Sequence, residues 1–262
     1  MADSRPIGIF DSGIGGLSIA QHIRQLMPTE DLIYLADSSY APYGEKTEAV
    51  VLQRAEHITQ TLLAHHVKAI VVACNTATMI AIRHLRAKYS LPFIGVEPGV
   101  KPAAANSKTG VIGVLATSKT LVSDAFKQLS QRVAHHVQLE IQPCPDLVIL
   151  IEALKLDKEQ AAATVAAYIR PLLEKNVDSL ILGCTHFSHL KPLIEEIAGP
   201  AVTVISTEQA VAKETLRRLN AEALLTEASA LGNNYFLSNG DLATFSRQID
   251  RLWPNTADIQ HF

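Results

Sequence analysis

Short apolar segments alternate along most of the chain with segments in which apolar residues recur every three or four positions. The first kind is typical of buried strands and the second of amphipathic helices. We predict strands at residues 7–10, 32–35, 68–73, 92–96, 110–115, 137–142, 177–182, 202–205 and 234–237. We predict helices at residues 17–27, 48–66, 76–88, 119–130, 147–156, 159–175, 189–198, 208–219 and 242–252. This alternation predicts an α/β fold whose mainly parallel sheets are covered by helices.

The strands and helices form two series of the same kind. Late in each series a strand ends in a cysteine, at Cys74 in "VVACNTAT" and at Cys184 in "LILGCTHF". The segment "EPGVKPAAANSK", residues 97–108, is the best candidate for the boundary between the two series. A length of 262 residues allows one large or two small domains. We therefore read the chain as two related α/β halves.

Composition narrows the class of protein. Hydrophobic residues make up 48% and charged residues 19%, which indicates a folded globular chain. The net charge is −3 and no long basic run occurs, which argues against an extended nucleic-acid-binding surface. No apolar stretch approaches the length of a membrane span, so we expect no membrane partner. Three cysteines far apart do not suggest a disulfide framework, and a reducing cytoplasm is the simplest compartment.

Reactive or polar residues follow four of the predicted strands. In open α/β sheets, ligands bind beyond the carboxyl ends of the strands. The residues at these four ends are Asp11 and Ser12; Cys74, Asn75 and Thr76; Thr117; and Cys184, Thr185 and His186. Four such ends together indicate a site more strongly than any one of them.

The cysteines allow several interpretations. A buried cysteine is usually a small hydrophobic residue, and Cys144 in "QPCPD" keeps that interpretation. Cys74 and Cys184 each lie between a strand and a predicted helix start, where the helix dipole favours the thiolate. Asp11 is the candidate proton acceptor beside Cys74, and His186 is the candidate beside Cys184, although His186 is equally well read as a structural histidine. Cys-x-His is not a common zinc spacing, so we expect no metal.

Two matched thiols suggest one particular reaction. A covalent cysteine nucleophile with a histidine base would use only one of them. If one thiolate removes a proton from a substrate carbon and a thiol on the opposite face returns one, the configuration of that carbon is inverted. Two equivalent strand ends in two similar halves would supply this pair.

The loop "DSGIGG", residues 11–16, also has three interpretations. It does not match the dinucleotide or P-loop glycine patterns. It can be a tight turn that needs glycine. Alternatively, its backbone N–H groups, together with Ser12, hold a small carboxylate.

Several motifs together resemble the bacterial glutamate racemases, a family of cofactor-independent amino-acid racemases. The motifs are "IGIFDSGIGGLS", "YLADSSYAPYGEK", "VVACNTAT", "GVEPGVKPA", "GVLATSKT", "LILGCTHF" and, in the tail, "NYFLSNGDLATF". The resemblance implies two similar domains, residues 1–97 with 208–262 and residues 98–207, related by pseudo-two-fold symmetry with the active site between them. It implies D-glutamate production for peptidoglycan, and hence for cell wall and cell shape, without a cofactor. We leave a homodimer open.

The resemblance also implies the roles of individual residues. Catalysis is assigned to Cys74, Cys184, Asp11, His186 and Glu152. Substrate binding is assigned to Ser12, Pro42, Tyr43, Gly44, Asn75, Thr76, Thr117, Thr120 and Thr185, the "PYG" loop receiving the side-chain carboxylate. The nearest alternative is an aspartate racemase of the same fold, because one methylene discriminates weakly. A non-catalytic dicarboxylate-binding module is an alternative of another class, and it leaves both cysteines unexplained.

Overall fold

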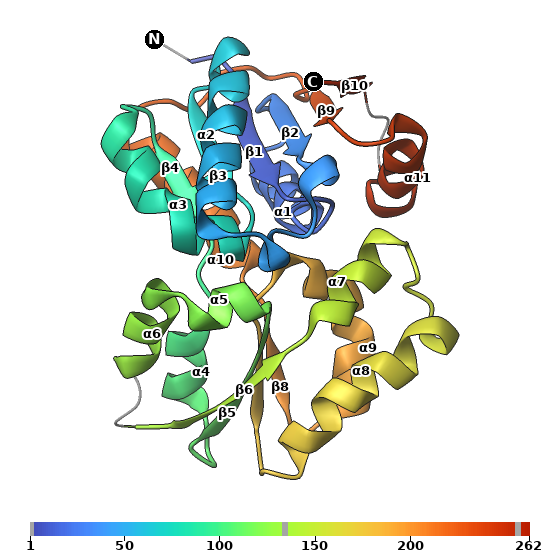
Figure 1. The fold of residues 1–262 in the computed structure, drawn as a ribbon. Coiled ribbons are helices and arrows are strands. Elements are labelled where there is room, and N and C mark those ends of the chain that lie inside the picture. Colours follow the sequence, from blue (N-terminus) through green and yellow to red (C-terminus); the bar gives the residue numbers. More distant parts are fainter. Residues whose placement is uncertain (1–2, 133–135, 255–257) are drawn as a thin grey trace. The chain divides into compact units, whose positions relative to one another are not determined.

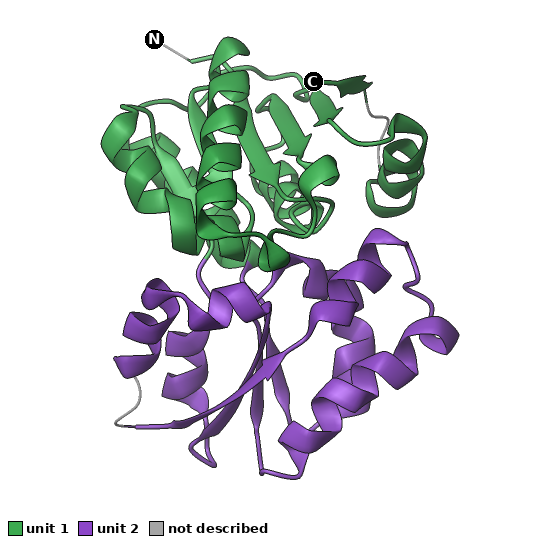
Figure 2. Cartoon of the chain, viewed as in Figure 1, with its two compact units in different colours: residues 1–96, 208–262 green, residues 97–207 purple. Residues whose placement is uncertain are grey.

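The computed structural model describes residues 3–132, 136–254 and 258–262, and Figure 1 shows the course of the chain. The chain divides into two compact units, coloured separately in Figure 2. Unit 1 contains residues 1–96 and 208–262, and unit 2 contains residues 97–207. Unit 1 is therefore built from both ends of the chain, whereas unit 2 is continuous.

Unit 1 is built on a six-stranded parallel sheet. The strands lie in the order β10-β9-β2-β1-β3-β4, so the returning C-terminal segment pairs with β2. Ile7 of β1 lies opposite Leu32 of β2, and Asn234 of β9 pairs with Leu32 on its other side. The strands are β1 (Ile7–Asp11), β2 (Leu32–Ala36), β3 (Ala69–Val72), β4 (Phe93–Gly95), β9 (Asn234–Ser238) and β10 (Asp258–His261).

Helices cover both faces of this sheet, as buried parallel strands require. Apolar side chains of α2 and α3 share a core cluster with alternate residues of the strands, among them Phe10, Leu35 and Val72. Helices α1 and α10 pack against each other, and in Figure 1 α2 crosses in front of the sheet while α10 lies behind it. The helices of unit 1 are α1 (Leu17–Leu26), α2 (Glu48–Ala64), α3 (Asn75–Lys88), α10 (Glu208–Ala221) and α11 (Leu242–Leu252), with short 3-10 turns η1 (Ser38–Tyr40) and η2 (Tyr43–Glu45).

Unit 2 repeats the same principle on a smaller scale. Its four parallel strands lie in the order β6-β5-β7-β8. They are β5 (Val111–Ala116), β6 (Gln138–Pro143), β7 (Ser179–Leu182) and β8 (Thr203–Ile205). The helices are α4 (Val100–Asn106), α5 (Ser118–Val122), α6 (Asp124–Gln131), α7 (Pro145–Glu152), α8 (Lys158–Leu173), α9 (Lys191–Ala198) and the 3-10 helix η3 (Thr185–Leu190). The predicted α/β class with parallel sheets is confirmed.

Some predicted elements are wrong in detail. The single helix predicted at residues 119–130 is two helices, because Ser123 has an extended backbone and its hydroxyl accepts the Phe126 N–H at 3.2 Å. The helix predicted at 189–198 begins only at Lys191, after a 3-10 helix. The short elements α4 and β10 were not predicted.

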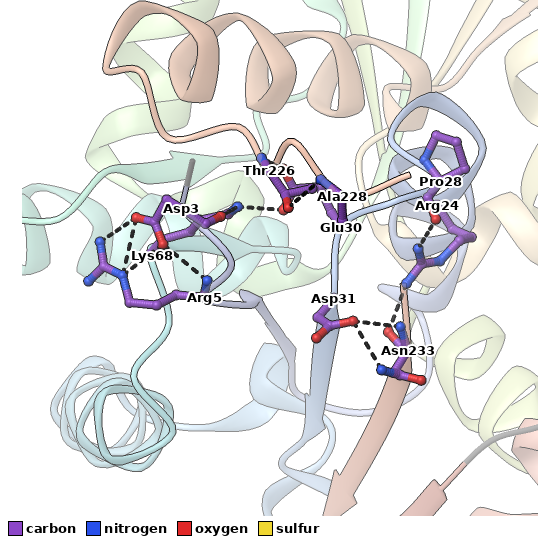
Figure 3. Close-up of polar contacts among 10 residues, drawn as sticks. All are labelled: Asp3, Arg5, Arg24, Pro28, Glu30, Asp31, Lys68, Thr226, Ala228 and Asn233. Carbon is purple, nitrogen blue, oxygen red and sulfur yellow. Dashed lines mark hydrogen bonds and ion pairs between the residues drawn. The ribbon is translucent and has the colours of Figure 1, made fainter. Parts of the chain in front are cut away.

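In unit 1 a buried ion pair joins the segments just before β2 and β3 (Figure 3). Lys68, just before β3, pairs with Glu30 at 2.5 Å and donates to the backbone oxygen of Asp3 at 2.6 Å. Glu30 accepts the Thr226 N–H at 2.8 Å. A Cβ on Gly232 would lie 2.1 Å from the Glu30 carbonyl oxygen, so only glycine allows the returning segment to pass this close. These contacts attach the C-terminal segment to the sheet at the edge opposite the carboxyl ends of the strands.

No helix in the described part of the chain is both long and apolar enough to cross a membrane.

Candidate active site

The candidate residues gather at the carboxyl ends of the strands within each unit. In unit 1, β1 ends at Asp11 and Cys74 follows β3, the strand next to it. In unit 2, Thr117 follows β5 and Cys184 follows the adjacent β7. Because all strands of each sheet are parallel, these ends lie along one edge. Each sheet therefore carries its own cysteine-bearing cluster of candidate residues.

Cys74 is the N-cap residue of α3, the helix that follows β3. Cys74 is 5% exposed, and its Sγ accepts the Ala77 N–H at 3.5 Å from the first turn of α3. A helix N-terminus presents unpaired N–H groups and a positive dipole end, both of which favour a thiolate over a thiol. The position of Cys74 at the start of a regular α-helix, predicted from the sequence, is found in the structure.

Asp11 lies buried beside this thiol and is fixed by backbone donors. Its two carboxylate oxygens accept the N–H groups of Ser12 and Gly16, each at 2.7 Å. The Ser12 hydroxyl lies 3.4 Å from Asp11 Oδ1 and 3.9 Å from Cys74 Sγ. Ser12 thus provides a hydrogen-bonded path between the thiol and the carboxylate.

The glycine-rich turn has a structural reason that the sequence did not specify. Gly16 has φ −67°, which any residue can adopt. A Cβ at Gly16, however, would lie 2.8 Å from the Ala73 Cβ and 3.0 Å from the Asp11 Cβ, closer than packed atoms approach. Glycine is therefore needed here for space, and the N–H groups of Ser12 and Gly16 bind Asp11, not an external carboxylate.

Other polar groups of unit 1 are buried at the same strand ends. Asn75 and Thr76 are each 3% exposed, and within the described structure the side-chain nitrogen of Asn75 has no hydrogen-bond partner. A buried donor without a partner is costly, and a bound acceptor would satisfy it. The Pro42–Gly44 loop contributes the buried ring of Tyr43 to the core cluster that contains Cys74.

Cys184 has different neighbours. Its Sγ lies 3.7 Å from Nδ1 of His186, and Nε2 of His186 lies 2.6 Å from Oε1 of Glu152 at the end of α7. His186 is 2% exposed and the Glu152 side chain is 20% exposed. The three groups form a thiol–imidazole–carboxylate series, an arrangement in which the carboxylate fixes the orientation of the imidazole. The structure thus brings together all three catalytic candidates of unit 2.

The turn that follows Cys184 is not an α-helix start. Residues Thr185–Leu190 form a 3-10 helix, and Lys191 begins the α-helix. A helix dipole therefore favours the thiolate of Cys74 more than that of Cys184. Gly183 packs closely here, because a Cβ would lie 3.0 Å from both the Ala116 Cβ and the Leu115 oxygen.

The two threonines after β5 are buried and joined to each other. Thr117 caps α5 by accepting the Thr120 N–H at 3.3 Å, and the two hydroxyl oxygens lie 3.0 Å apart. Thr185, next to Cys184, is 4% exposed. The strand ends of unit 2 therefore supply three hydroxyl groups in addition to the thiol.

The third cysteine has a structural setting. Cys144 is fully buried and donates to the Gln142 carbonyl oxygen at 3.3 Å. Burial raises the pKa of this thiol, and the nearby Cys184 and Asp146 raise it further. In the described residues no group of three or more His, Cys, Asp or Glu side chains is arranged to hold a metal ion.

Three residues that hold the Pro42–Gly44 loop were not predicted from the sequence. Asp37 is a fully buried carboxylate that binds the Tyr43 hydroxyl, the Arg54 guanidinium and the Asn239 amide. One signal was available, since Asp37 follows the strand β2 at the same edge as the other candidates. Arg54 and Asn239 carried no sequence signal, because they reach Asp37 from distant parts of the chain.

Comparison with known proteins identifies the family. The family model of Asp/Glu/hydantoin racemases matches residues 17–215. A glutamate racemase of Herpetosiphon aurantiacus is 46% identical over 243 residues, which cover 93% of this chain and 96% of that protein. These matches extend over both units.

Solved structures agree with the sequence match. An Escherichia coli glutamate racemase in complex with L-glutamate and the activator UDP-MurNAc-ala is 30% identical, with a TM-score of 0.87 and 98% of each chain covered. A Francisella tularensis glutamate racemase in complex with D-glutamate is 29% identical, with a TM-score of 0.85 over 99% of this chain and 98% of that one. An aspartate racemase of Picrophilus torridus is more distant, with 18% identity and a TM-score of 0.53 over 85% of this chain and 96% of that one. The chain is therefore an isomerase that belongs to the Asp/Glu/hydantoin racemase family, and the glutamate racemases in that family are its similar relatives.

Proposed function

We propose that this protein interconverts L-glutamate and D-glutamate by a two-base proton transfer. The observation that carries the proposal is the pair of thiols at equivalent strand ends, each with its own acid–base partners. One thiolate takes the α-proton and becomes a thiol, leaving a carbanion. The opposite thiol then gives its proton to the other face of the α-carbon and becomes a thiolate, so that charge and protons balance over one turnover.

The hydrogen-bond donors of the two half-sites fit an amino-acid dicarboxylate. The unpartnered Asn75 nitrogen and the hydroxyl groups of Ser12, Thr117 and Thr185 suit the α-carboxylate and α-amino groups. The Pro42–Gly44 loop would receive the side-chain carboxylate. Relatives that bind either enantiomer of glutamate support this assignment.

The product D-glutamate would supply peptidoglycan synthesis. All three cysteines are free, and both catalytic thiols must stay reduced, so we place the reaction in the cytoplasm. No cofactor is needed in this mechanism, because the chain's own thiols move the proton.

The test follows the α-proton of L-glutamate. The purified protein, in buffer free of metal and pyridoxal phosphate, should drive the optical rotation of L-glutamate to zero and exchange its α-proton for deuterium in heavy water, as proton NMR measures. Added EDTA or hydroxylamine should leave the rate unchanged. Loss of activity in EDTA and its recovery with zinc would contradict this mechanism.

The same assay separates the alternatives. A dicarboxylate-binding module would bind glutamate without exchanging its α-proton. An aspartate racemase would show the larger kcat/KM with aspartate, although one methylene is worth only about 10- to 200-fold. Growth of a D-glutamate auxotroph without added D-glutamate would test the biosynthetic role.

A further inference from the structure

The carboxylate of Asp37 is fully buried, just after β2, and receives four hydrogen bonds. Its Oδ2 accepts the Tyr43 hydroxyl at 2.5 Å and Arg54 Nε at 2.9 Å. Its Oδ1 accepts Arg54 Nη2 at 2.7 Å and Asn239 Nδ2 at 2.5 Å. Each oxygen therefore has two donors, and two of the four come from a guanidinium, the strongest geometry for a carboxylate.

The donors come from three separate parts of unit 1. Tyr43 belongs to the Pro42–Gly44 loop, Arg54 to α2, and Asn239 to the returning C-terminal segment just after β9. Asp37 also donates its own N–H to the Asp11 carbonyl oxygen at 3.0 Å. One side chain and its backbone thus connect the loop, a helix, the C-terminal segment and the strand end that carries Asp11.

The chain on either side of Asp37 is held by the same groups. The Arg54 guanidinium lies 4.0 Å from the centre of the Tyr40 ring. The Asn239 side-chain oxygen accepts the Ser39 N–H at 3.0 Å, and its carbonyl oxygen accepts the Ser39 hydroxyl at 2.6 Å. Segment 37–43 therefore has one conformation that several contacts maintain together.

The Arg54 guanidinium stays charged. Burial alone lowers the pKa of Arg54, but the hydrogen bond and charge of Asp37 raise it overall. Burial also raises the pKa of Tyr43, followed by the effect of the neighbouring Asp37 charge, so the phenol remains a donor. A buried ion pair contributes little net stability compared with apolar residues of the same size, so the contribution of this one is geometric.

We propose that Asp37, Arg54 and Asn239 are positioning residues that hold Tyr43 and so set the selectivity of the Pro42–Gly44 loop for a distal carboxylate. This inference rests on the proposed function, because it assigns that loop to the side-chain carboxylate of glutamate. The Tyr43 hydroxyl is bound to Asp37, so the ring is fixed and the backbone of the loop is presented in one orientation. Removing the contacts of Asp37, Arg54 or Asn239 leaves the carboxylate-binding groups of the loop without a fixed position. The contacts around the two thiols are not changed.

The experiment compares two probes that cannot react. Glutarate has both carboxylates of glutamate, and butyrate lacks the distal one; calorimetry measures the dissociation constant of each. The wild-type protein should prefer glutarate by at least about tenfold, which corresponds to ~1.4 kcal/mol. In Tyr43→Phe, Arg54→Lys and Asp37→Asn this preference should fall about tenfold, with butyrate affinity changed less than about twofold. The KM for glutamate should rise more than kcat falls.

The matched control is an arginine–carboxylate pair elsewhere in unit 1. Arg5 binds Asp3 through Nε and Nη2, as Arg54 binds Asp37, but the Arg5 side chain is 53% exposed. The variant Arg5→Gln should leave the preference for glutarate unchanged. Circular dichroism checks folding, and Tyr43→Phe, which removes a single oxygen, serves as the test if Asp37→Asn does not fold.

The outcomes separate the positioning role from the proposed function. If the wild-type protein does not exchange the α-proton of glutamate, the proposed function fails whatever the variants do. If it does exchange that proton and the folded Tyr43→Phe and Arg54→Lys variants keep the full preference for glutarate, the positioning role is overturned. Equal weakening of glutarate and butyrate would also overturn it, because that result indicates a structural role only.

Discussion

The two turns that carry Cys74 and Cys184 follow the same kind of strand, but different groups surround the two thiols. Each follows a buried parallel strand, but Cys74 caps a regular α-helix and touches a hydroxyl, whereas Cys184 precedes a 3-10 helix and touches an imidazole. The carboxylate beyond Ser12 is held by backbone amides, and the carboxylate beyond His186 comes from the end of α7. In the proposed two-base mechanism the two thiols exchange roles in each turnover, so they need matched proton affinities but not matched surroundings.

Replacing each thiol separately tests this comparison most directly and should have the largest effect. Cys74→Ser and Cys184→Ser should each lower racemisation by about 10³-fold or more, because a serine hydroxyl is scarcely ionised at neutral pH. Each variant keeps one thiolate, which can still remove a proton from one enantiomer. With a β-chloro analogue of glutamate, that removal leads to loss of chloride without any reprotonation.

The two variants should then act on opposite enantiomers of the β-chloro analogue. The family resemblance assigns Cys74 to D-glutamate and Cys184 to L-glutamate, so Cys184→Ser should release chloride from the D-analogue and Cys74→Ser from the L-analogue. Chloride release over time is the measurement. Release from the same enantiomer by both variants would rule out one thiol on each face.

Replacing the partners of the thiols should give a smaller and one-sided effect. We expect Asp11→Asn and His186→Asn to lower kcat by about 10²-fold in one direction and less in the other, since each group serves its own thiol. Rates are measured from L-glutamate and from D-glutamate. The comparison must use kcat, because the equilibrium constant makes kcat/KM fall equally in both directions. Wild-type rates in both variants would remove these residues from the mechanism.

Ser12 and Glu152, which contact the partners of the two thiols, allow a finer comparison of the two units. Ser12→Ala breaks the path from Cys74 to Asp11, and Glu152→Gln removes the charge that orients His186. Each should cost about tenfold in kcat, in the same direction as the variant of the residue it supports. Identical profiles for the two variants would show that the halves do not act separately.

The smallest effect is expected at Cys144. Because burial raises the pKa of this thiol, it stays protonated from about pH 7 to about pH 9, and iodoacetamide should leave it unlabelled in the folded protein. Cys144→Ala should keep racemisation within about twofold of wild type. Mass spectrometry of labelled peptides and the racemisation assay test both statements. Rapid labelling of Cys144 would contradict the structural interpretation of this residue.

The strands and the ends at which they stop could be predicted because the signals are local. A run such as residues 69–73 is apolar enough to be a buried strand whatever surrounds it, and a polar residue after its end marks the sheet edge. The break at Ser123 was missed because apolar periodicity continues through it, and only the hydroxyl cap on Phe126 separates the helices. Strand β10 was missed because its burial is slight and its identity depends on pairing with β9.

Some candidate site residues could likewise be predicted from local signals, and others could not. Cys74, Cys184 and His186 could be found from strand ends, and the resemblance added Glu152, which a pattern in one segment does not reveal. Asn239 could not be found by either route, because it lies 202 residues from Asp37 in the chain and its role exists only after β9 has paired with β2.

The return of the chain to unit 1 has a consequence for synthesis on the ribosome. The edge of β2 that pairs with β9 stays unpaired until β9 has been made. About 200 residues must still be translated after β2 emerges before β9 is complete. At about 5–20 residues per second this takes roughly 10–40 s, during which the nascent protein carries an uncovered strand. The continuous unit 2 can complete its own sheet within that interval. A ribosome that stalls before Asn234 would therefore release a chain with one finished unit and one adhesive edge, a natural client for chaperones and proteases.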